Sequence, residues 1–194
     1  MADGTTEELN SEEITWTLRV VQFHNLPEKE PFDFDALSYT WGNQKHTFPF
    51  ICNSQLLQVH HNLHAALPYL ARRRSRLPIW IDAICTNQQD EAEKMVQIRQ
   101  MHQIYRRAHT VWIWLGPPVE GTAAAIQMLL DFTASAKRVD MRKRVYQVAN
   151  NPWFDRLWVI QEAALARRPQ FLIGLHEIEW TVMKCFEHEK GLLT

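Results

Sequence analysis

The sequence predicts an α/β fold with a largely parallel central sheet flanked by helices. Short apolar segments of strand length alternate along the chain with longer segments that have helical periodicity. In addition, residues 77–84 and 109–116 are largely apolar, and in the first of them only Asp82 interrupts the run. Such nearly continuous apolar runs are typical of strands that are buried on both faces, as in a parallel sheet.

The N-terminal third predicts a tail, two strands and a hairpin. Residues 1–13 are acidic and polar, and we expect them to be disordered. Residues 14–23 alternate as a half-buried strand does, with one side made of Ile14, Trp16, Leu18 and Val20. Residues 36–42 form a short apolar strand that Gly42 ends. Two further short strands flank Asn53 and Ser54, which predicts a hairpin at that point.

The middle of the chain predicts two helices. Residues 60–74 have leucines at helical spacing, and Pro68 is expected to kink or shorten this helix. Residues 87–108 form the strongest helix prediction, because acidic residues occupy the first turn and two arginines the last. Its apolar stripe consists of Met95, Ile98, Met101 and Tyr105.

The remaining third predicts three helices and a strand. Helices are expected over about 122–135 and 137–150, and the segment 156–168 is expected to form a third. Residues 170–174 predict a strand, followed by a last hairpin or helix. No internal repeat or low-complexity tract is present.

Length and composition predict one domain, residues 14–194, after the tail. The 194 residues are 46% hydrophobic and 22% charged, with a formal net charge of −1. This near-neutral charge argues against nucleic acid or an anionic membrane as a partner. No apolar run approaches the roughly 20 residues of a membrane span. Three widely spaced cysteines without a CxxC pair argue against a disulfide scaffold or a structural zinc site, so we expect a cytoplasmic protein.

Candidate site residues cluster where predicted strands end. In an open parallel sheet, ligands bind beyond the carboxyl ends of the strands. Tyr39, Trp41 and Gly42 end one strand, and Asp82 and Asn87 end or follow another. Trp158 and Glu162 lie one helical turn apart on the helix 156–168, which can reach the same edge. An indole that stacks on a base and a carboxylate that binds ribose hydroxyls would suit a nucleotide, although no GxGxxG or GxxxxGK phosphate motif is present.

Each of these residues also has a purely structural interpretation. A glutamate in the middle of a helix, such as Glu162, is usually solvated; an aspartate at a strand end, such as Asp82, usually caps a loop; and both tryptophans can simply pack. The histidines at 60, 61 and 64 resemble a metal cluster, but no fourth ligand is in view and we predict no metal. Cys85 lacks a histidine base and is expected to fill apolar space. The basic stretch 137–144 is expected to be a solvated helix face, with a partner or nucleic-acid patch as the alternative.

The blocks "DALSYTWG", "LPIWIDAICTNQQ" with a long helix after it, "HTVWIWLG" and "RLWVIQEAALA" follow one another along the chain. In these blocks the chain resembles the fungal heterokaryon-incompatibility (HET) domain. The resemblance covers roughly residues 14–182, and its most specific block is "WIDAIC", with "NQ" and a long helix after it. Thr86 departs from the family pattern, which usually has an apolar residue there. Membership implies an effector of fungal regulated cell death, triggered when incompatible individuals fuse. It also implies further regions in longer family members, and an upstream sensor protein or domain as a partner.

A second, more distant resemblance is to the TIR domain. It implies a TIR-like, flavodoxin-like sheet with an added N-terminal strand and hairpin region. In TIR domains that cleave NAD, a W-x-x-x-E helix carries the catalytic glutamate, and this pattern falls on Trp158 and Glu162. About forty residues separate "WLG" from that helix, which is looser than in the family.

The resemblance implies an NAD glycohydrolase with NAD as the substrate and no cofactor. Glu162 would be catalytic, and the substrate-binding residues would be Tyr39, Trp41, Gly42, Asp82, Asn87 and Trp158. Activity would depend on self-association. Glu162→Ala should abolish turnover with little loss of stability, because a residue at the edge of the sheet leaves no cavity in the core. The main alternative is a signalling module without turnover that oligomerises and recruits partners. A nucleic-acid enzyme that uses Asp82 and Glu162 with a divalent metal is a third interpretation, but the near-neutral charge of the chain gives it no support.

Overall fold

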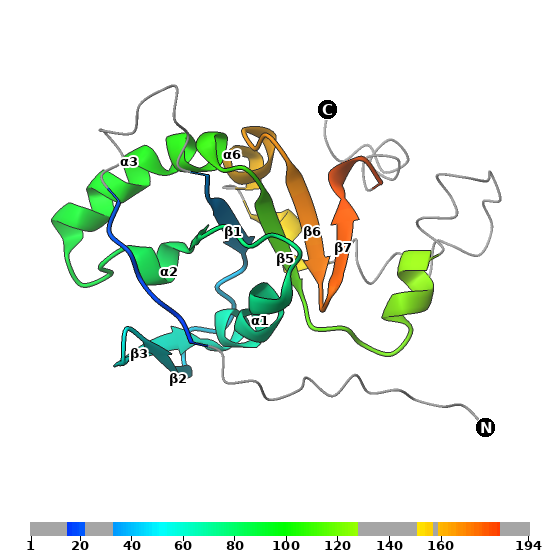
Figure 1. Ribbon diagram of the computed structural model, residues 1–194, viewed down its shortest axis with the longest axis horizontal. Helices are drawn as coiled ribbons and strands as arrows, with labels where there is room; N and C mark the ends of the chain where they lie inside the picture. Colours follow the sequence, from blue (N-terminus) through cyan, green and yellow to red (C-terminus); the bar gives the residue numbers. More distant parts are fainter. Residues whose placement is uncertain (1–14, 22–32, 128–150, 157–158, 183–194) are drawn as a thin grey trace.

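A five-stranded sheet runs through the centre of the molecule (Figure 1). The structure is a computed structural model, and it describes residues 15–21, 33–127, 151–156 and 159–182. In spatial order the strands are β4 (Ile79–Trp80), β1 (Asp35–Tyr39), β5 (Val111–Gly116), β6 (Pro169–Ile173) and β7 (His176–Glu179). The first four are parallel, and β7 pairs antiparallel with β6. The predicted α/β class with a largely parallel sheet is therefore confirmed.

The order of the strands determines where a ligand can bind. Numbered along the chain within this sheet, the strands follow the order 2-1-3-4-5. This is the doubly wound, flavodoxin-like order, in which ligands bind beyond the carboxyl ends of the strands where the order reverses. That point lies between β1 and β5. The side chains at the end of β1 are thus the ones to inspect.

Helices cover both faces of the sheet (Figure 1). Helix α1 (His61–Arg72) packs its leucines against Leu37, Trp112 and Leu172 on one face. Helices α3 (Glu91–Arg107) and α6 (Val159–Ala164) lie on the other, where Tyr105 and Ala163 pack in one cluster with strand residues. Because successive strand residues face opposite ways, Ser38 shares the α3 and α6 face with Ala36.

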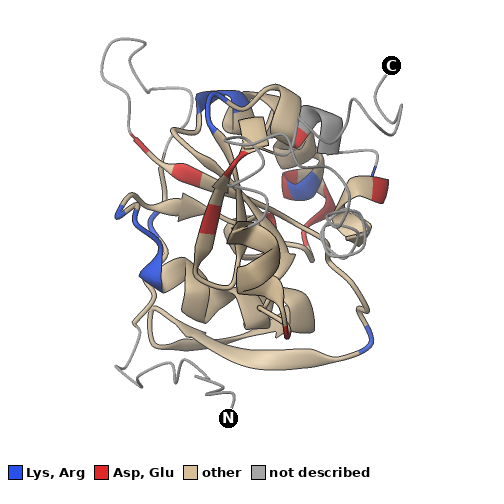
Figure 2. Ribbon diagram, turned by 90° about the vertical axis from the view of Figure 1, so that its right-hand side faces the viewer, with Lys and Arg blue, Asp and Glu red and all other residues tan. Residues whose placement is uncertain are grey.

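The predicted hairpin is confirmed and forms a separate two-stranded sheet, with β2 (Thr47–Cys52) paired to β3 (Gln55–His60). Its turn residues Asn53 and Ser54 have φ values of 50° and 59°, the conformation of a type I′ turn. Neither strand contains a lysine, arginine, aspartate or glutamate, so both strands of the hairpin are tan in Figure 2.

The strand predicted over 14–23 is wrong within the described residues. Trp16 forms only an isolated bridge to Cys52, and Val20 is 95% exposed. The segment instead lies against the hairpin turn, where the Leu18 amide donates to Asn53 Oδ1 (3.0 Å) and Asn53 Nδ2 donates to the Leu18 carbonyl (3.1 Å). The hairpin turn provides backbone hydrogen-bond partners for only two or three residues of this segment, and a strand needs a longer row of partners.

The strand predicted over 77–84 is also largely wrong. Only Ile79 and Trp80 pair, and they form the edge of the sheet beside β1. The chain then turns into a short helix, α2 (Asp82–Cys85), after Ile81, whose carbonyl accepts from the Cys85 amide at 2.7 Å. A short apolar run in the sequence is compatible with an edge strand followed by a helix as well as with a central strand, so periodicity alone does not distinguish them.

Two of the predicted helices match well. Helix α3 begins after Asp90, whose Oδ1 accepts from the amides of Ala92 and Glu93 at 2.9 and 3.1 Å. Helix α1 continues past Pro68 to Arg72, so the prediction that this proline shortens the helix is wrong. An internal proline costs about 3 kcal/mol. Burial of one leucine contributes about 1.5–3 kcal/mol, and α1 buries three, Leu63, Leu67 and Leu70.

The C-terminal half agrees with the predictions where it is described. Strands β5 and β6 match the segments 109–116 and 170–174, and β7 completes the last hairpin. Residues 122–127 are helical, as expected for the start of the helix 122–135. Helix α6 is shorter than the predicted 156–168. The tail 1–13 and the helix 137–150, which holds the basic stretch, lie outside the described residues.

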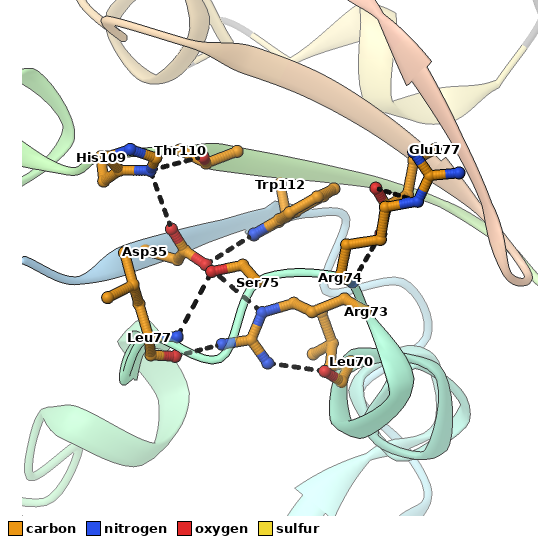
Figure 3. Close-up of polar contacts among 10 residues, drawn as sticks. All are labelled: Asp35, Leu70, Arg73, Arg74, Ser75, Leu77, His109, Thr110, Trp112 and Glu177. Carbon is orange, nitrogen blue, oxygen red and sulfur yellow. Dashed lines mark hydrogen bonds and ion pairs between the residues drawn. The ribbon is translucent and has the colours of Figure 1, made fainter.

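A buried ion pair lies at the amino end of β1, opposite the end that the strand order marks for a ligand (Figure 3). Asp35 is fully buried, and its Oδ2 accepts from Trp112 Nε1 (2.9 Å) and Arg73 Nε (3.4 Å). Arg73 also donates to the carbonyls of Leu70 and Leu77, which fixes the chain between α1 and β4.

Among the described residues, no helix is both long and apolar enough to cross a membrane.

Candidate functional site

Glu162 lies in the interior of the protein, at the carboxyl end of β1. Its exposed fraction is 2%, although it belongs to the short helix α6. The Ser38 hydroxyl donates to Glu162 Oε2, and Trp153 Nε1 donates to Ser38 Oγ at 2.7 Å. Ser38 comes from β1 and Trp153 from the 3-10 helix η2 (Pro152–Asp155). Three segments therefore fix the position of one carboxylate.

Arg156 neutralises Glu162. Its Nη1 donates to Glu162 Oε2 at 3.2 Å and its Nη2 to Oε1 at 3.1 Å, a paired arrangement that favours the ionised carboxylate. Burial raises the pKa of Glu162 above its ordinary value, and the Arg156 charge and the Ser38 hydrogen bond offset part of that rise. The net direction is upward, so Glu162 is easier to protonate than a glutamate in water.

Asp82 is a second carboxylate of the same site. Trp41 Nε1 donates to its Oδ2 at 2.8 Å, the Ala83 amide donates to its Oδ1 at 2.7 Å, and Tyr39 also hydrogen-bonds to it. Burial raises the pKa of Asp82, and these hydrogen bonds lower it in part. Burial, and then the nearby Asp82, raise the pKa of Tyr39, so this phenol stays protonated.

A cleft of about 300 Å³ opens between these groups and α3. This size lies at the lower end of the range for ligand sites. Its walls come from the end of β1, β4 with α2, α3, and the segment that leads into α6; the lining residues are Trp41, Trp80, Asp82, Thr86, Gln88, Lys94, Gln97, Ile98, Met101, Arg156 and Glu162. The cleft thus joins two carboxylates, two cationic side chains and two indoles beyond the carboxyl ends of β1 and β4.

A second cavity of about 470 Å³ lies beside the turn after β1, and because Thr40 and Leu115 line it, this cavity and not the cleft borders the point between β1 and β5 where the strand order reverses. It contains Gly42, which has a φ of 66°, and the uncharged side chains of Asn62, Phe48 and Asn151, among others. Asn62 Nδ2 donates to the Thr40 carbonyl at 2.6 Å, and this hydrogen bond stabilises the turn after β1.

The predicted site residues divide into four groups. Glu162, Asp82 and Trp41 line the cleft together, and Tyr39 is buried next to Asp82. Gly42 lines the second cavity instead. Asn87 is exposed and shapes the loop before α3, because its Oδ1 accepts from the Gln89 amide at 3.1 Å. Trp158 lies outside the described residues.

Glu162 lies at the expected end of the sheet, but it is buried and is not the edge residue without a cavity that was expected. A buried, doubly paired carboxylate cannot be removed without leaving Arg156 unpaired, so replacement by alanine is expected to cost stability. Asp82 was also interpreted as a residue that hydrogen-bonds local backbone, and its Oδ1 does accept from the Ala83 amide in the first turn of α2, but the side chain also lines the cleft.

Sequence reasoning missed Ser38, Trp80, Lys94 and Arg156. One signal was available for Ser38, because a polar side chain inside an apolar strand buried on both faces needs a hydrogen-bond partner. For Arg156 the signal was its position six residues before Glu162. Neither signal identifies the partner, which tertiary packing supplies.

The other residues considered from the sequence have structural surroundings. Rings of His61 and His64 pack against Phe48, with centroids 5.4 and 5.0 Å apart. Within the described ranges, no three His, Cys, Asp or Glu side chains are grouped as metal ligands are. Burial raises the pKa of the Cys85 thiol, which opposes a nucleophilic role.

Comparison with known proteins gives one family. The family model described as "Heterokaryon incompatibility protein (HET)" matches residues 34–162. The chain is also 26% identical to "Heterokaryon incompatibility protein 6, OR allele" of Neurospora crassa, over 78% of this chain and 30% of that protein. It therefore spans less than a third of the length of that relative. No solved structure matches the chain. The matched range includes every residue that lines the cleft.

Proposed function

Because this chain belongs to the fungal heterokaryon-incompatibility family, we propose that it acts in that process by cleaving the nicotinamide–ribose bond of NAD in the cleft described above. Family membership supports the role in heterokaryon incompatibility. The NAD chemistry rests on one observation, the buried and positioned carboxylate of Glu162 at the carboxyl end of β1.

The chemistry suits a carboxylate with little proton transfer. Nicotinamide leaves NAD as a neutral molecule, so its departure needs no strong general acid. What needs stabilisation is the positive charge that develops on the ribose, and a carboxylate supplies this in glycoside hydrolysis. Glu162 takes that role. Water then adds to the ribose carbon and gives ADP-ribose and a proton.

Glu162 has one hydrogen-bond acceptor site left for a ribose hydroxyl, counting its contacts with the described residues. A carboxylate has about four acceptor sites. Glu162 accepts three hydrogen bonds from described residues, of which two fall on Oε2 and one on Oε1. The remaining site is on Oε1. A ribose hydroxyl that donates there would be held without displacing Ser38 or Arg156.

The indoles suit the flat part of the substrate. Trp41 and Trp80 line the cleft, and Trp41 is held in place by its hydrogen bond to Asp82. Stacking of an aromatic ring on an indole contributes about 1–3 kcal/mol. In this proposal the nicotinamide ring contacts these indoles, and Asp82 acts as the group that positions Trp41.

Release of nicotinamide from NAD, measured by chromatography, tests the proposal. The protein is assayed dilute and after clustering through a tag, because activity is proposed to require self-association. Glu162→Gln should abolish release, whereas Glu120→Gln, which alters an exposed glutamate outside the cleft, should leave it unchanged. Equal release by wild type and Glu162→Gln in the clustered state contradicts the assignment.

A signalling module without turnover is the second candidate, and two observations favour it. The Arg156 pair satisfies Glu162 in the way a structural ion pair does. In addition, residues 91–103 of α3 contain no buried side chain, and Met95 and Val96 are 48% and 50% exposed. Exposed apolar groups of this kind mark interaction surfaces. No nicotinamide in any assembled state, combined with loss of assembly in Met95→Glu, supports this candidate.

A further inference from the structure

Two cationic side chains line the cleft, from elements far apart in the sequence. Lys94 lies on α3, and Arg156 lies between η2 and α6. Both are partly accessible, with exposed fractions of 37% and 21% for the side chains. The same cleft contains the carboxylates of Asp82 and Glu162, which by themselves would repel an anionic ligand. The cations thus change which ligands the cleft can accept.

Arg156 has donors to spare. A guanidinium carries five N–H donors in a planar fork. Two of them bind Glu162, one from each Nη, among the contacts with described residues. The Nε–H and the second hydrogens of both Nη atoms remain. Arg156 can therefore bind an anion and keep Glu162 in place at the same time.

Lys94 can leave its present ion pair for a ligand anion at a small cost in free energy. Its one described partner is Glu91, at 3.5 Å in an exposed pair where the glutamate is 79% accessible. Such surface pairs contribute little, since water solvates both partners. Exchanging this contact for a ligand anion in the cleft places the ammonium group in a less solvated position, where its attraction for an anion is stronger.

The wall formed by α3 changes from polar to apolar along the helix. Lys94, Gln97, Ile98 and Met101 have helical spacing and all line the cleft. The next turn contains Tyr105, which is buried and contacts Trp80 edge to face with ring centroids 5.7 Å apart. Met101, one turn before Tyr105, packs against the core and lies nearer the interior than Lys94, whereas Ile98 is 39% exposed. A ligand with a flat ring at its inner end and an anionic group at its outer end matches this order.

We propose that Lys94 and Arg156 together bind a phosphate group, so that the ligand of this cleft is a phosphorylated nucleotide rather than a nucleoside or a free base. The inference rests on the proposed function in that it concerns the same cleft. It adds the two residues that select the substrate class.

A pair of probes that differ by one phosphate tests the inference without turnover. Nicotinamide mononucleotide and nicotinamide riboside are titrated separately into the whole chain at low salt, with tryptophan fluorescence or calorimetry as the readout. We expect the mononucleotide to bind at least about tenfold more tightly, the factor that one well-placed ionic contact supplies. Added salt should narrow this difference, because it screens the attraction between the phosphate and the two cations, whereas the pyridinium charge is common to both probes.

Variants assign the preference to residues. Lys94→Gln should weaken the mononucleotide about three- to tenfold and leave the riboside unchanged. Arg99→Gln, an exposed change on the same helix outside the cleft, should alter neither. Arg156→Lys keeps the charge but loses the fork, and should weaken the mononucleotide more than Lys94→Gln does. Because Lys94 is a surface residue, its variant remains informative if the Arg156 variant folds poorly.

The outcomes separate this inference from the proposed function. Equal binding of both probes, no binding of either, or an equal effect of Lys94→Gln on both overturns the phosphate site, even if NAD is cleaved. A phosphate preference that depends on Lys94, with no nicotinamide released from NAD, supports the phosphate site and contradicts the glycohydrolase.

Discussion

Ser38 on β1 donates a hydrogen bond to Glu162, 124 residues further along the chain. The contact brings α6 to the end of β1 that borders the cleft. Trp153 donates in turn to Ser38, so a chain of hydrogen bonds runs from the core to the carboxylate. The orientation of Glu162 is therefore decided in the interior and not by its own short helix.

Replacing Ser38 with alanine is expected to reduce stability and alter the ionisation of Glu162. The change leaves Trp153 Nε1 without its acceptor, which costs about 1–3 kcal/mol. The hydrogen bond from Ser38 lowers the pKa of Glu162, so its loss should raise that pKa further. If Glu162 must be ionised for turnover, the acidic limb of the pH–rate profile moves to higher pH. Denaturant unfolding and the pH profile measure the two effects. Ser75→Ala is the control for the pH profile, because the Ser75 hydroxyl lies outside the cleft and accepts from the Leu77 amide at 3.3 Å. An unshifted profile would argue that Glu162 does not titrate in the reaction.

Replacing Asp82 with asparagine should make stability less dependent on pH. Burial raises the folded-state pKa of Asp82 above its ordinary value of 3.8. Between the unfolded and the folded pKa, the native state binds more protons, so this group makes the fold less stable as pH rises through that window. Asp82→Asn removes the contribution. Unfolding free energies measured by urea from pH 4 to pH 7 should fall less in the variant. Identical slopes would contradict the shift.

Two adjacent arginines offer a matched test of the buried ion pair shown in Figure 3. Arg73→Met leaves Asp35 buried without its cation, and should destabilise the protein by about 3–5 kcal/mol. Arg74→Met removes an exposed contact to Glu177 at 3.8 Å, and should cost about 1 kcal/mol or less. Chemical denaturation of both variants provides the comparison. Equal losses would show that the pair is not the reason for the difference.

Glycine at position 54 should stabilise the hairpin. Ser54 has a φ of 59°, a conformation that costs an L-residue about 1–2 kcal/mol relative to glycine. Asn-Gly is also the preferred sequence for a type I′ turn. Ser54→Gly should raise the unfolding free energy by about 0.5–1 kcal/mol, and Ser54→Val should lower it. Thermal unfolding of the two variants distinguishes these outcomes. A loss of stability in the glycine variant would refute the turn assignment.

Local signals allowed helix α3 and strands β1, β5 and β6 to be predicted, because caps, charges and apolar runs lie within the segments themselves. The prediction of one long strand over 77–84 is wrong because an apolar run is compatible with two structures. It fits a central strand, and it fits equally well a two-residue edge strand, Ile79 and Trp80, followed by the buried Ile81. The tertiary structure decides between the two, because β4 pairs with β1 on one side and has no strand on its other side in the described sheet.

Three members of the site were predictable from the sequence, but the burial of its glutamate and its cationic side chains were not. Glu162, Asp82 and Trp41 could be brought together from the rule that ligands bind at strand ends. The burial of Glu162 could not, because it follows from contacts with Ser38 and Arg156 that no local pattern encodes. Asn87 shows the opposite error, since a polar residue after a strand end can serve the loop alone.

The brevity of β4 has a consequence for assembly. An edge strand offers its free amide and carbonyl groups to other chains, and protein filaments often grow by adding strands at such a margin. With two residues in β4, that margin of the sheet presents too little backbone to template an incoming strand. Copies of this protein that meet on that side would have to recognise one another through side chains, and such contacts can be reversed by a single charge.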